Sequence, residues 1–136
     1  MTSGVDQWNQ RVIDEFHANK GEVSGPFQPV LLLTHTGRKS GQQRVNPLVY
    51  MEDGDRHIVF GSKAGFATHP DWYLNLVANP NVTVEVGTDK FDATATEVIG
   101  EERDHLYETH AAVHTEFQGY AEKTPRKIPV IALNRK

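Results

Sequence analysis

The sequence predicts a fold of the α+β class, mainly β: a small antiparallel barrel of about six strands with three flanking helices. Three observations predict it. The 136 residues, 38% of them hydrophobic, suffice for one domain with a buried core. Short apolar segments of strand length are separated by turn residues. The links between these segments are too short for the helical crossovers that join parallel strands, which favours antiparallel pairing.

The first half of the chain is predicted to form one helix and three strands. Val5, Trp8, Val12 and Phe16 recur at helical spacing, so an amphipathic helix should precede a break at Gly21–Pro26. Strands should follow at Val30–Leu33, Val45–Met51 and His57–Gly61, the last two joined by the turn Asp53-Gly54-Asp55.

The second half is predicted to add two helices and three strands. Pro70 and Asp71 are typical of a helix start, and Asn79-Pro80 would end the helix Trp72–Ala78. Strict alternation of apolar and polar residues predicts a hairpin from two strands. These strands are Val82–Val86 and Phe91–Ile99, followed by a helix from Gly100 with Leu106, His110, Val113 and Phe117 on one side, and a last strand Ile128–Leu133.

The composition excludes several classes of protein. No cysteine is present, so disulfide frameworks, thiolate nucleophiles and cysteine-bearing metal sites are excluded. The formal net charge of -4 argues against nucleic acid as a partner. Because we find neither a signal peptide nor an apolar run of membrane-spanning length, we expect a soluble cytoplasmic protein without a supported membrane contact. We expect a single domain over 1–136, with a helix and linker in 1–25 and the barrel in 26–136; the sequence predicts no oligomeric state.

Two familiar kinds of catalytic site lack support. His110 and His114 have the i, i+4 spacing of metal ligands on one helical face, but no third ligand is suitably spaced, so no metal site is expected. A Gly-x-Ser-x-Gly nucleophile elbow is also missing from the sequence. The sequence therefore nominates no nucleophile.

A cationic turn between the first two strands is the clearest functional signal. The segment Thr36–Leu48 carries Arg38, Lys39 and Arg44 and no acidic residue, although the chain as a whole is acidic. Its glycine spacing matches neither a Walker loop nor a dinucleotide-binding fingerprint. Arginine forks and a mobile lysine suit a phosphate or carboxylate ligand, and glycines let backbone amides approach it. The turn predicts an anion site, with an ordinary solvated turn as the alternative.

Two neighbouring features could extend this site. Because proline cannot donate to a strand ladder, Asn46-Pro47 predicts that the second strand is interrupted or lies at an edge there. The freed backbone groups could face a ligand, or the segment could be an ordinary edge strand. Gly61–Gly65 follows the third strand and again places small residues around a cation, Lys63. If the first three strands are neighbours, Lys63 could meet the same ligand.

Several motifs in a fixed order resemble the deazaflavin-dependent nitroreductase family. They are Leu31-Leu32-Leu33-Thr34, the turn Thr36-Gly-Arg-Lys-Ser-Gly-Gln with Arg44 and Asn46-Pro47-Leu48, Gly61-Ser-Lys, Pro70-Asp-Trp-Tyr-Leu-Asn-Leu, Ala78-Asn-Pro and Arg126-Lys-Ile-Pro, and they span Val30–Leu133. The resemblance implies a split β-barrel that binds coenzyme F420, an 8-hydroxy-5-deazaflavin with a phosphate and an oligoglutamate tail. It also implies hydride transfer from the reduced cofactor to an electrophilic acceptor.

The resemblance implies roles for individual residues on the cofactor side. Arg38, Lys39 and Arg44 would hold the phosphate and tail with Lys63 assisting, Asn46, Pro47 and Leu48 would edge the ring, and Ser62, Trp72 and Asn75 would line its pocket. A polyanionic tail would explain the charge of the turn, and a planar ring suits an apolar barrel beside it.

The acceptor side departs from the family pattern. Where the nitroimidazole-reducing member of the family has tyrosines, this sequence keeps only Tyr120 and has Phe117, His114 and Val49 at the other positions. Nitroimidazole reduction is therefore in doubt, and we expect a quinone such as menaquinone, another nitroaromatic or a conjugated carbonyl as acceptor. Tyr120 or His114 would supply the proton that follows the hydride, and Ser62 is the third candidate catalytic residue.

Two alternatives stay open. A non-catalytic module could store or carry deazaflavin or another anionic ligand, which the missing tyrosines would suit. An enzyme that uses flavin mononucleotide (FMN), resembling the pyridoxamine phosphate oxidases, would have a similar barrel, but the spacing of Arg38 and Arg44 fits the deazaflavin group better.

Overall fold

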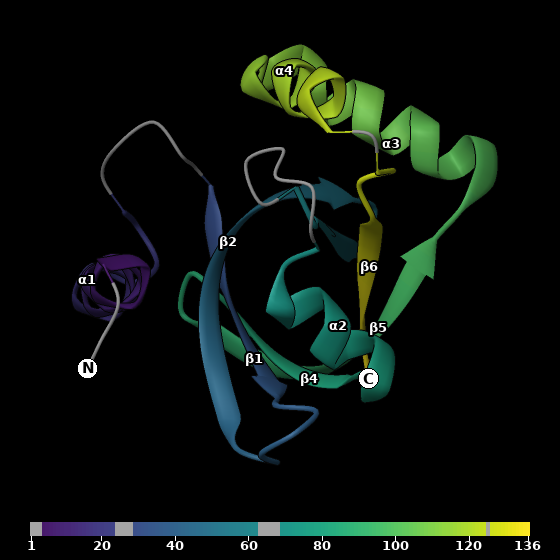
Figure 1. Cartoon of the computed structure of the whole chain (residues 1–136). Helices are drawn as coiled ribbons and strands as arrows, with labels where there is room; N and C mark the ends of the chain where they lie inside the picture. Colours follow the sequence, from purple (N-terminus) through teal and green to yellow (C-terminus); the bar gives the residue numbers. More distant parts are fainter. Residues whose placement is uncertain (1–3, 24–28, 63–68, 125) are drawn as a thin grey trace.

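A computed structural model describes residues 4–23, 29–62, 69–124 and 126–136. The elements, in chain order, are α1 (Gly4–Ala18), β1 (Val30–Thr36), β2 (Gln43–Asp53), β3 (Arg56–Phe60), α2 (Asp71–Ala78), β4 (Asn81–Val86), β5 (Asp89–Val98), α3 (Gly100–Val113), α4 (Glu116–Lys123) and β6 (Val130–Arg135). The strands close into an antiparallel barrel in the order β1-β2-β3-β6-β5-β4. The predicted mainly β barrel is confirmed (Figure 1).

The interior of the barrel follows from the two-residue period of its strands. Leu31 and Leu33 on β1 point inward and are fully buried, and Val84 on β4 and Leu133 on β6 meet them in one core cluster. Helix α2 adds Trp72 and other apolar residues to this cluster. On β4 the alternation in the sequence is also an alternation of burial, whereas on β1 and β6 successive residues are buried, so both faces of these two strands are covered.

A second core lies between the sheet and the helices α3 and α4. Phe60 and Val130, on β3 and β6, pack with Leu106, Tyr107 and Phe117. In Figure 1 these two helices cover one end of the barrel, and the tip of the β1–β2 hairpin lies at the opposite end. The molecule therefore has two chemically different ends.

The sequence-based prediction of three helices is wrong, because the described residues contain four. The predicted helix from Gly100 stops at Val113, and His114 leaves the helical region with φ -109° and ψ 82°. Helix α4 then starts at Glu116. This break lets Phe117 turn back onto the sheet, where its carbonyl accepts a hydrogen bond of 2.6 Å from the hydroxyl of Tyr107.

Pro47 does not interrupt β2, which runs unbroken and pairs with β1 along the full length of β1. The edge alternative is confirmed locally. Pairing of β2 with β3 begins only at Tyr50, so the side of Gln43–Val49 that faces away from β1 has no strand neighbour among the described residues. A proline is tolerated there because no ladder bond is lost on that side.

Helix α1 lies beside the barrel, against β2 and the β4–β5 hairpin (Figure 1). Phe16 anchors it and is 2% exposed. His17 Nε2 lies 3.0 Å from a carboxylate oxygen of Glu85 on β4. Among the described residues, no helix has the length and apolar character needed to cross a membrane.

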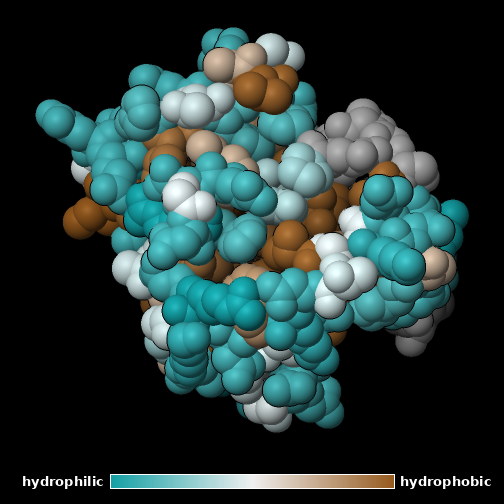
Figure 2. Space-filling view, turned by 180° about the vertical axis from the view of Figure 1, so that it is seen from behind, coloured by the Kyte–Doolittle hydropathy of each residue, from teal (hydrophilic) through white to brown (hydrophobic). Residues whose placement is uncertain are grey.

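Hydrophobic side chains reach the surface in separate places. Figure 2 shows the face behind that of Figure 1, where hydrophobic residues lie between hydrophilic ones over the described part of the surface. Among the described residues, the exposed large hydrophobic side chains are those of Val45, Val77, Ile99 and Val113.

Candidate functional site

In the structure the cationic turn is residues 37–42 between β1 and β2, and Arg44 lies just after it on β2. The turn is held by its own backbone. The amide of Gly37 donates to the carbonyl of Gln42 at 2.8 Å, and Gly41 donates to Gly37 at 2.9 Å. Gly41 has φ +72°, which a side chain would strain. Beside the turn lies a hollow of about 310 Å³, lined by Gly37, Arg38, Lys39, Ser40, Arg44, Asp71 and Asn75. The structure thus brings the three predicted cations to one concave surface.

The three cations differ in how they are engaged. Arg38 donates from Nη1 to Oδ1 of Asn75 at 2.9 Å, and its Nη2 lies 3.5 Å from a carboxylate oxygen of Asp71. Lys39 and Arg44 are exposed, and their side chains have no ion pair or hydrogen bond with any residue in the described part of the chain. Two of the three charges are therefore not neutralised by the protein and face the hollow.

A buried polar network lies directly beneath the turn. The imidazole of His35, on β1, is 2% exposed. Its Nε2 lies 2.7 Å from Oδ1 of Asn46, and its Nδ1 lies 3.1 Å from Nδ2 of Asn75. Oδ1 of Asn75 also accepts from the backbone amide of Arg38 at 3.1 Å. Burial lowers the pKa of His35, the bond to Asn46 partly opposes it, and the charge of Arg44 adds a smaller lowering.

The residues predicted to edge the ring divide between two faces of β2. Asn46 bonds to the inward-facing His35, and Leu48 packs against the barrel core, so both side chains point inward. Pro47 and Val49 alternate with them and are half-buried. Trp72 is a core residue with 6% exposure, and Asn75 is buried within the network under the turn. The structure therefore gathers Asn46 and Asn75 with the cations and leaves Trp72 in the core.

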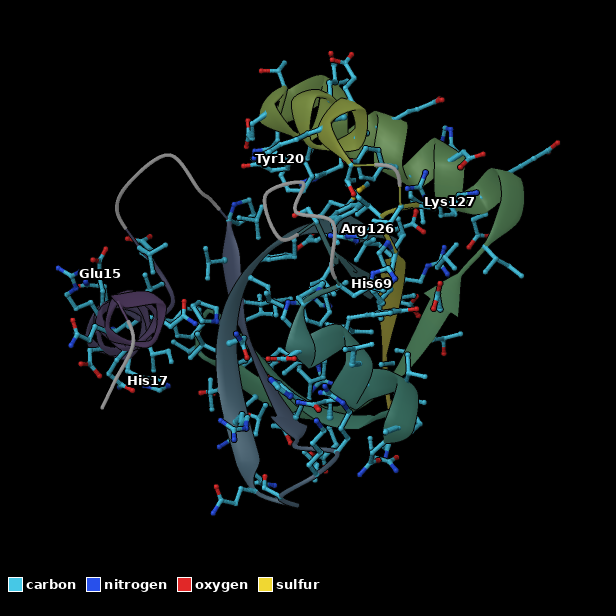
Figure 3. The ribbon with its side chains drawn as sticks, in the orientation of Figure 1. Glu15, His17, His69, Tyr120, Arg126 and Lys127 are labelled. Atoms are coloured by element: carbon cyan, nitrogen blue, oxygen red, sulfur yellow. The ribbon has the colours of Figure 1, made fainter. Side chains whose placement is uncertain are left out.

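Arg126 ties together the chain segments on either side of the predicted Lys63 region. Its guanidinium donates to the carbonyls of Gly61 and Ser62 at 3.0 and 2.7 Å and lies 3.0 Å from Nδ1 of His69. Figure 3 shows Arg126 close to His69, with Tyr120 of α4 above them. Ser62 is thus fixed through its backbone, whereas Lys63 lies outside the described residues.

The predicted acceptor residues lie at the helical end of the barrel. Phe117 is buried and contacts Phe60, His110 and Tyr120 edge-on. His114 is half-buried, with its ring 4.5 Å from that of His110. Burial and the charge of Glu116 raise the pKa of Tyr120, so its hydroxyl keeps its proton at neutral pH. Tyr120 and His114 thus lie at the border of one aromatic cluster, formed by Phe60, His110 and Phe117.

The two groups of predicted site residues lie at opposite ends of the barrel. The unneutralised cations are at the end of the barrel where the β1–β2 hairpin turns, and Tyr120 is at the helical end (Figures 1 and 3). The free edge of β2 runs between them.

Comparison with known proteins decides the family. Residues 8–135 match the family model described as F420H(2)-dependent quinone reductase. The chain belongs to this family. An F420H(2)-dependent quinone reductase of Mycobacterium tuberculosis is 39% identical over 114 residues, which cover 79% of this chain and 74% of that protein.

Solved structures agree with this family assignment. An F420-H2 dependent reductase is 38% identical, with a TM-score of 0.72 over 83% of this chain and all of the other. A second structure, described as a domain-swapped dimer, is 36% identical with a TM-score of 0.74 and covers 94% of this chain and 98% of that one. A haem storage protein of Vibrio cholerae, at 17% identity and a TM-score of 0.61, shares the fold. As a member of the quinone reductase family, the chain is an F420-dependent oxidoreductase, and coenzyme F420 is its cofactor.

Two residues of the site were missed by reasoning from sequence. His35 belongs to a strand run whose neighbours are buried leucines, and nothing local shows that two amides flank it. Arg126 lies in a motif quoted for the resemblance, but its contacts are 57 to 65 residues away in the sequence. Only the three-dimensional fold shows what these two residues do.

Proposed function

We propose that this F420-dependent reductase uses a quinone as its hydride acceptor. The observation that carries the choice of a quinone is the match of residues 8–135 to the quinone reductase family model. The unneutralised cations Lys39 and Arg44, at a hollow of about 310 Å³, support binding of the anionic cofactor. The proposal is further supported by the quinone reductase names of the family and of its curated relatives. A small electrophile such as menaquinone, or a nitroaromatic or conjugated carbonyl of similar shape, is the class of acceptor we propose.

The described residues fit the cofactor at its charged end. Lys39 and Arg44 offer donors to a phosphate and several carboxylates, and each charge-assisted hydrogen bond contributes on the order of 1.5–3 kcal/mol. Arg38 would add its remaining donors, since part of its guanidinium is held by Asn75. We place Lys63 with this group on the resemblance alone.

For the ring we propose the free edge of β2. Asn46, Pro47 and Leu48 would border it, with Ser62 and Asn75 around its pocket, and the buried Trp72 would support the wall of this pocket from the core. When bound, coenzyme F420 in its reduced form supplies a hydride. The protein's part is to orient the two reactants and to exclude water. Orientation of this kind can lower the activation barrier of the hydride transfer by several kcal/mol.

For the acceptor we propose the region of Val49, His114, Phe117 and Tyr120. The quinone gains a proton as well as a hydride, and Tyr120 and His114 are the candidate proton donors. Tyr120 supports this role because burial keeps its hydroxyl protonated. If Tyr120→Phe and His114→Ala both leave turnover and its pH profile unchanged, neither residue donates the proton.

The cofactor part of the proposal is tested by binding. Lys39→Ala combined with Arg44→Ala should weaken affinity for coenzyme F420 by about 100-fold or more, because two charge-assisted contacts are lost. Fluorescence titration of the purified protein measures this affinity. Lys90→Ala is a matched control, since Lys90 is an exposed lysine on the β4–β5 hairpin. Unchanged affinity in the double variant would refute the tail site.

The acceptor part is tested by turnover and separates the alternatives. We expect the protein to oxidise reduced F420 in the presence of members of a panel of quinones. The absorbance of the cofactor measures this oxidation. Binding of F420 without oxidation of its reduced form across quinones, nitroaromatics and conjugated carbonyls would favour a carrier. Tight binding of FMN without affinity for F420 would instead favour a flavin enzyme.

A further inference from the structure

The network under the cationic turn fixes the hydrogen positions of three side chains. Arginine and backbone N–H groups are donors only, so the atom of Asn75 that faces both of them at Arg38 must be its carbonyl oxygen. The amide nitrogen of Asn75 then faces His35 and donates to Nδ1. A neutral imidazole that accepts at Nδ1 carries its hydrogen on Nε2, and this hydrogen is donated to Oδ1 of Asn46.

The same sequence of bonds determines what Asn46 presents to a ligand. Its carbonyl oxygen is engaged inward, so both hydrogens of its amide nitrogen are left for acceptors outside the network. Within the described residues this nitrogen has no hydrogen-bond partner. A flipped Asn46 amide would instead present an oxygen, which repels phosphate, carboxylate and carbonyl oxygens. The orientation of one amide therefore decides between attraction and repulsion.

We propose that His35 is a positioning residue for the cofactor site: it holds the Asn46 amide with its N–H groups facing the acceptor oxygens of coenzyme F420, and through Asn75 it holds Arg38. This inference rests on the proposed function, because it takes the cofactor to lie beside Asn46. His35 itself is too deeply buried to touch a ligand, at 2% exposure. It acts entirely through its two amide neighbours.

The surroundings of His35 favour the neutral ring that this role needs. A proton on Nδ1 of His35 would point at the N–H groups of Asn75, so two hydrogen-bond donors would face each other without an acceptor. The charged groups around the network are Arg44 on β2, Arg38 in the turn and Asp71 at the start of α2. Two of these three are cations, and they add to the burial that disfavours an imidazolium.

A double-mutant cycle on affinity for coenzyme F420 tests the proposal. His35→Leu should weaken binding about tenfold, because the Asn46 amide is then free to flip. Asn46→Ala should weaken it by a similar factor. If His35 acts through Asn46, the double variant should bind clearly better than the product of the two single losses predicts, since contacts that depend on one another do not add. Fully additive losses would overturn the proposal, as would unchanged affinity in His35→Leu.

Two controls keep the result specific. His57→Leu removes another sheet histidine, which lies between the rings of Tyr50 and Phe91, and should leave the affinity unchanged. If His35→Leu does not fold, as judged by its unfolding transition, His35→Met replaces it in the cycle, because methionine has a similar volume and no hydrogen-bond donor for Asn46. Loss of binding in the Lys39 and Arg44 double variant without any effect at His35 would refute this inference alone. No effect in either set would refute the cofactor site itself.

Discussion

At the scale of single residues, Arg126 shows how one side chain can join three segments. Its guanidinium bonds to Gly61, Ser62 and His69, and burial lowers its pKa although the guanidinium stays charged. We predict that Arg126→Lys lowers the free energy of unfolding by on the order of 2–3 kcal/mol, because an ammonium cannot reach all three acceptors. Urea unfolding measures the change.

The neighbouring lysine supplies the control for this prediction. Lys127 is exposed and lies 3.6 Å from a carboxylate oxygen of Asp104 on the surface. Lys127→Ala should therefore cost less than about 1 kcal/mol. Equal losses in the two variants would mean that Arg126 stabilises the protein only as a surface charge.

Residues differ in how far the sequence alone could predict their roles. Arg38, Lys39 and Arg44 were predictable as one site because they are close in sequence, in the turn between β1 and β2 and at the start of β2. The unequal engagement of Arg38 was not, since its partner Asn75 is 37 residues away. His35 was unpredictable for the same reason, because its two partners come from β2 and α2.

At the scale of elements, the attachment of α1 depends on a contact between two glycines. Gly21 has φ +92°, and a Cβ added there would lie 2.4 Å from Cα of Gly87 in the turn between β4 and β5. A backbone atom cannot move aside as the end of a side chain can. We predict that Gly21→Ala lowers the free energy of unfolding by about 1 kcal/mol through strain and by roughly 1–3 kcal/mol more through the clash.

Gly54 is the matched control for Gly21. It also has a positive φ, +63°, but nothing lies within 4 Å of the added Cβ. Gly54→Ala should therefore cost only the strain of about 1 kcal/mol. Urea unfolding gives the two losses, and limited proteolysis after α1 shows whether the helix has detached. A loss in Gly21→Ala no larger than that in Gly54→Ala would contradict the role of the contact.

The predictability of the elements follows the strength of their local pattern. The β4–β5 hairpin was predictable because its apolar and polar residues alternate strictly around the turn at Gly87. The break between α3 and α4 was not, because Val113 and Phe117 keep the helical spacing across it. That break is decided by the packing of Phe117 on Phe60 and Tyr107, which is a tertiary effect.

At the scale of the whole molecule, closing the sheet into a barrel separates two chemical environments. The hairpin end exposes cations over a polar network, and the helical end buries aromatic rings. Two buried histidines, His35 and His110, lie one at each end. Both have a lowered pKa, so both make the folded state bind fewer protons than the unfolded chain in mild acid.

The larger of these two effects belongs to His110 and predicts how stability depends on pH. Burial, and then the charge of His114, lower its pKa to about 4 from an ordinary value of 6.5. Its ring stacks on Phe60 at 4.1 Å. Between these two pH values the unfolded chain takes up a proton that the folded chain refuses. The contribution of His110 should therefore leave the free energy of unfolding unchanged above pH 6.5. It should lower this free energy by roughly 3 kcal/mol as the pH drops to 4.

His110→Leu should remove this part of the pH dependence, because leucine has no proton to gain and suits the apolar cluster. Urea unfolding at several pH values compares the slopes of the two proteins. His105→Leu, at an exposed position of the same helix, controls for loss of an imidazole from the surface. His35 still titrates in the His110 variant, so a smaller loss in the same direction should persist. A slope in His110→Leu as steep as that of the unchanged protein would show that His110 is not the group that resists protonation.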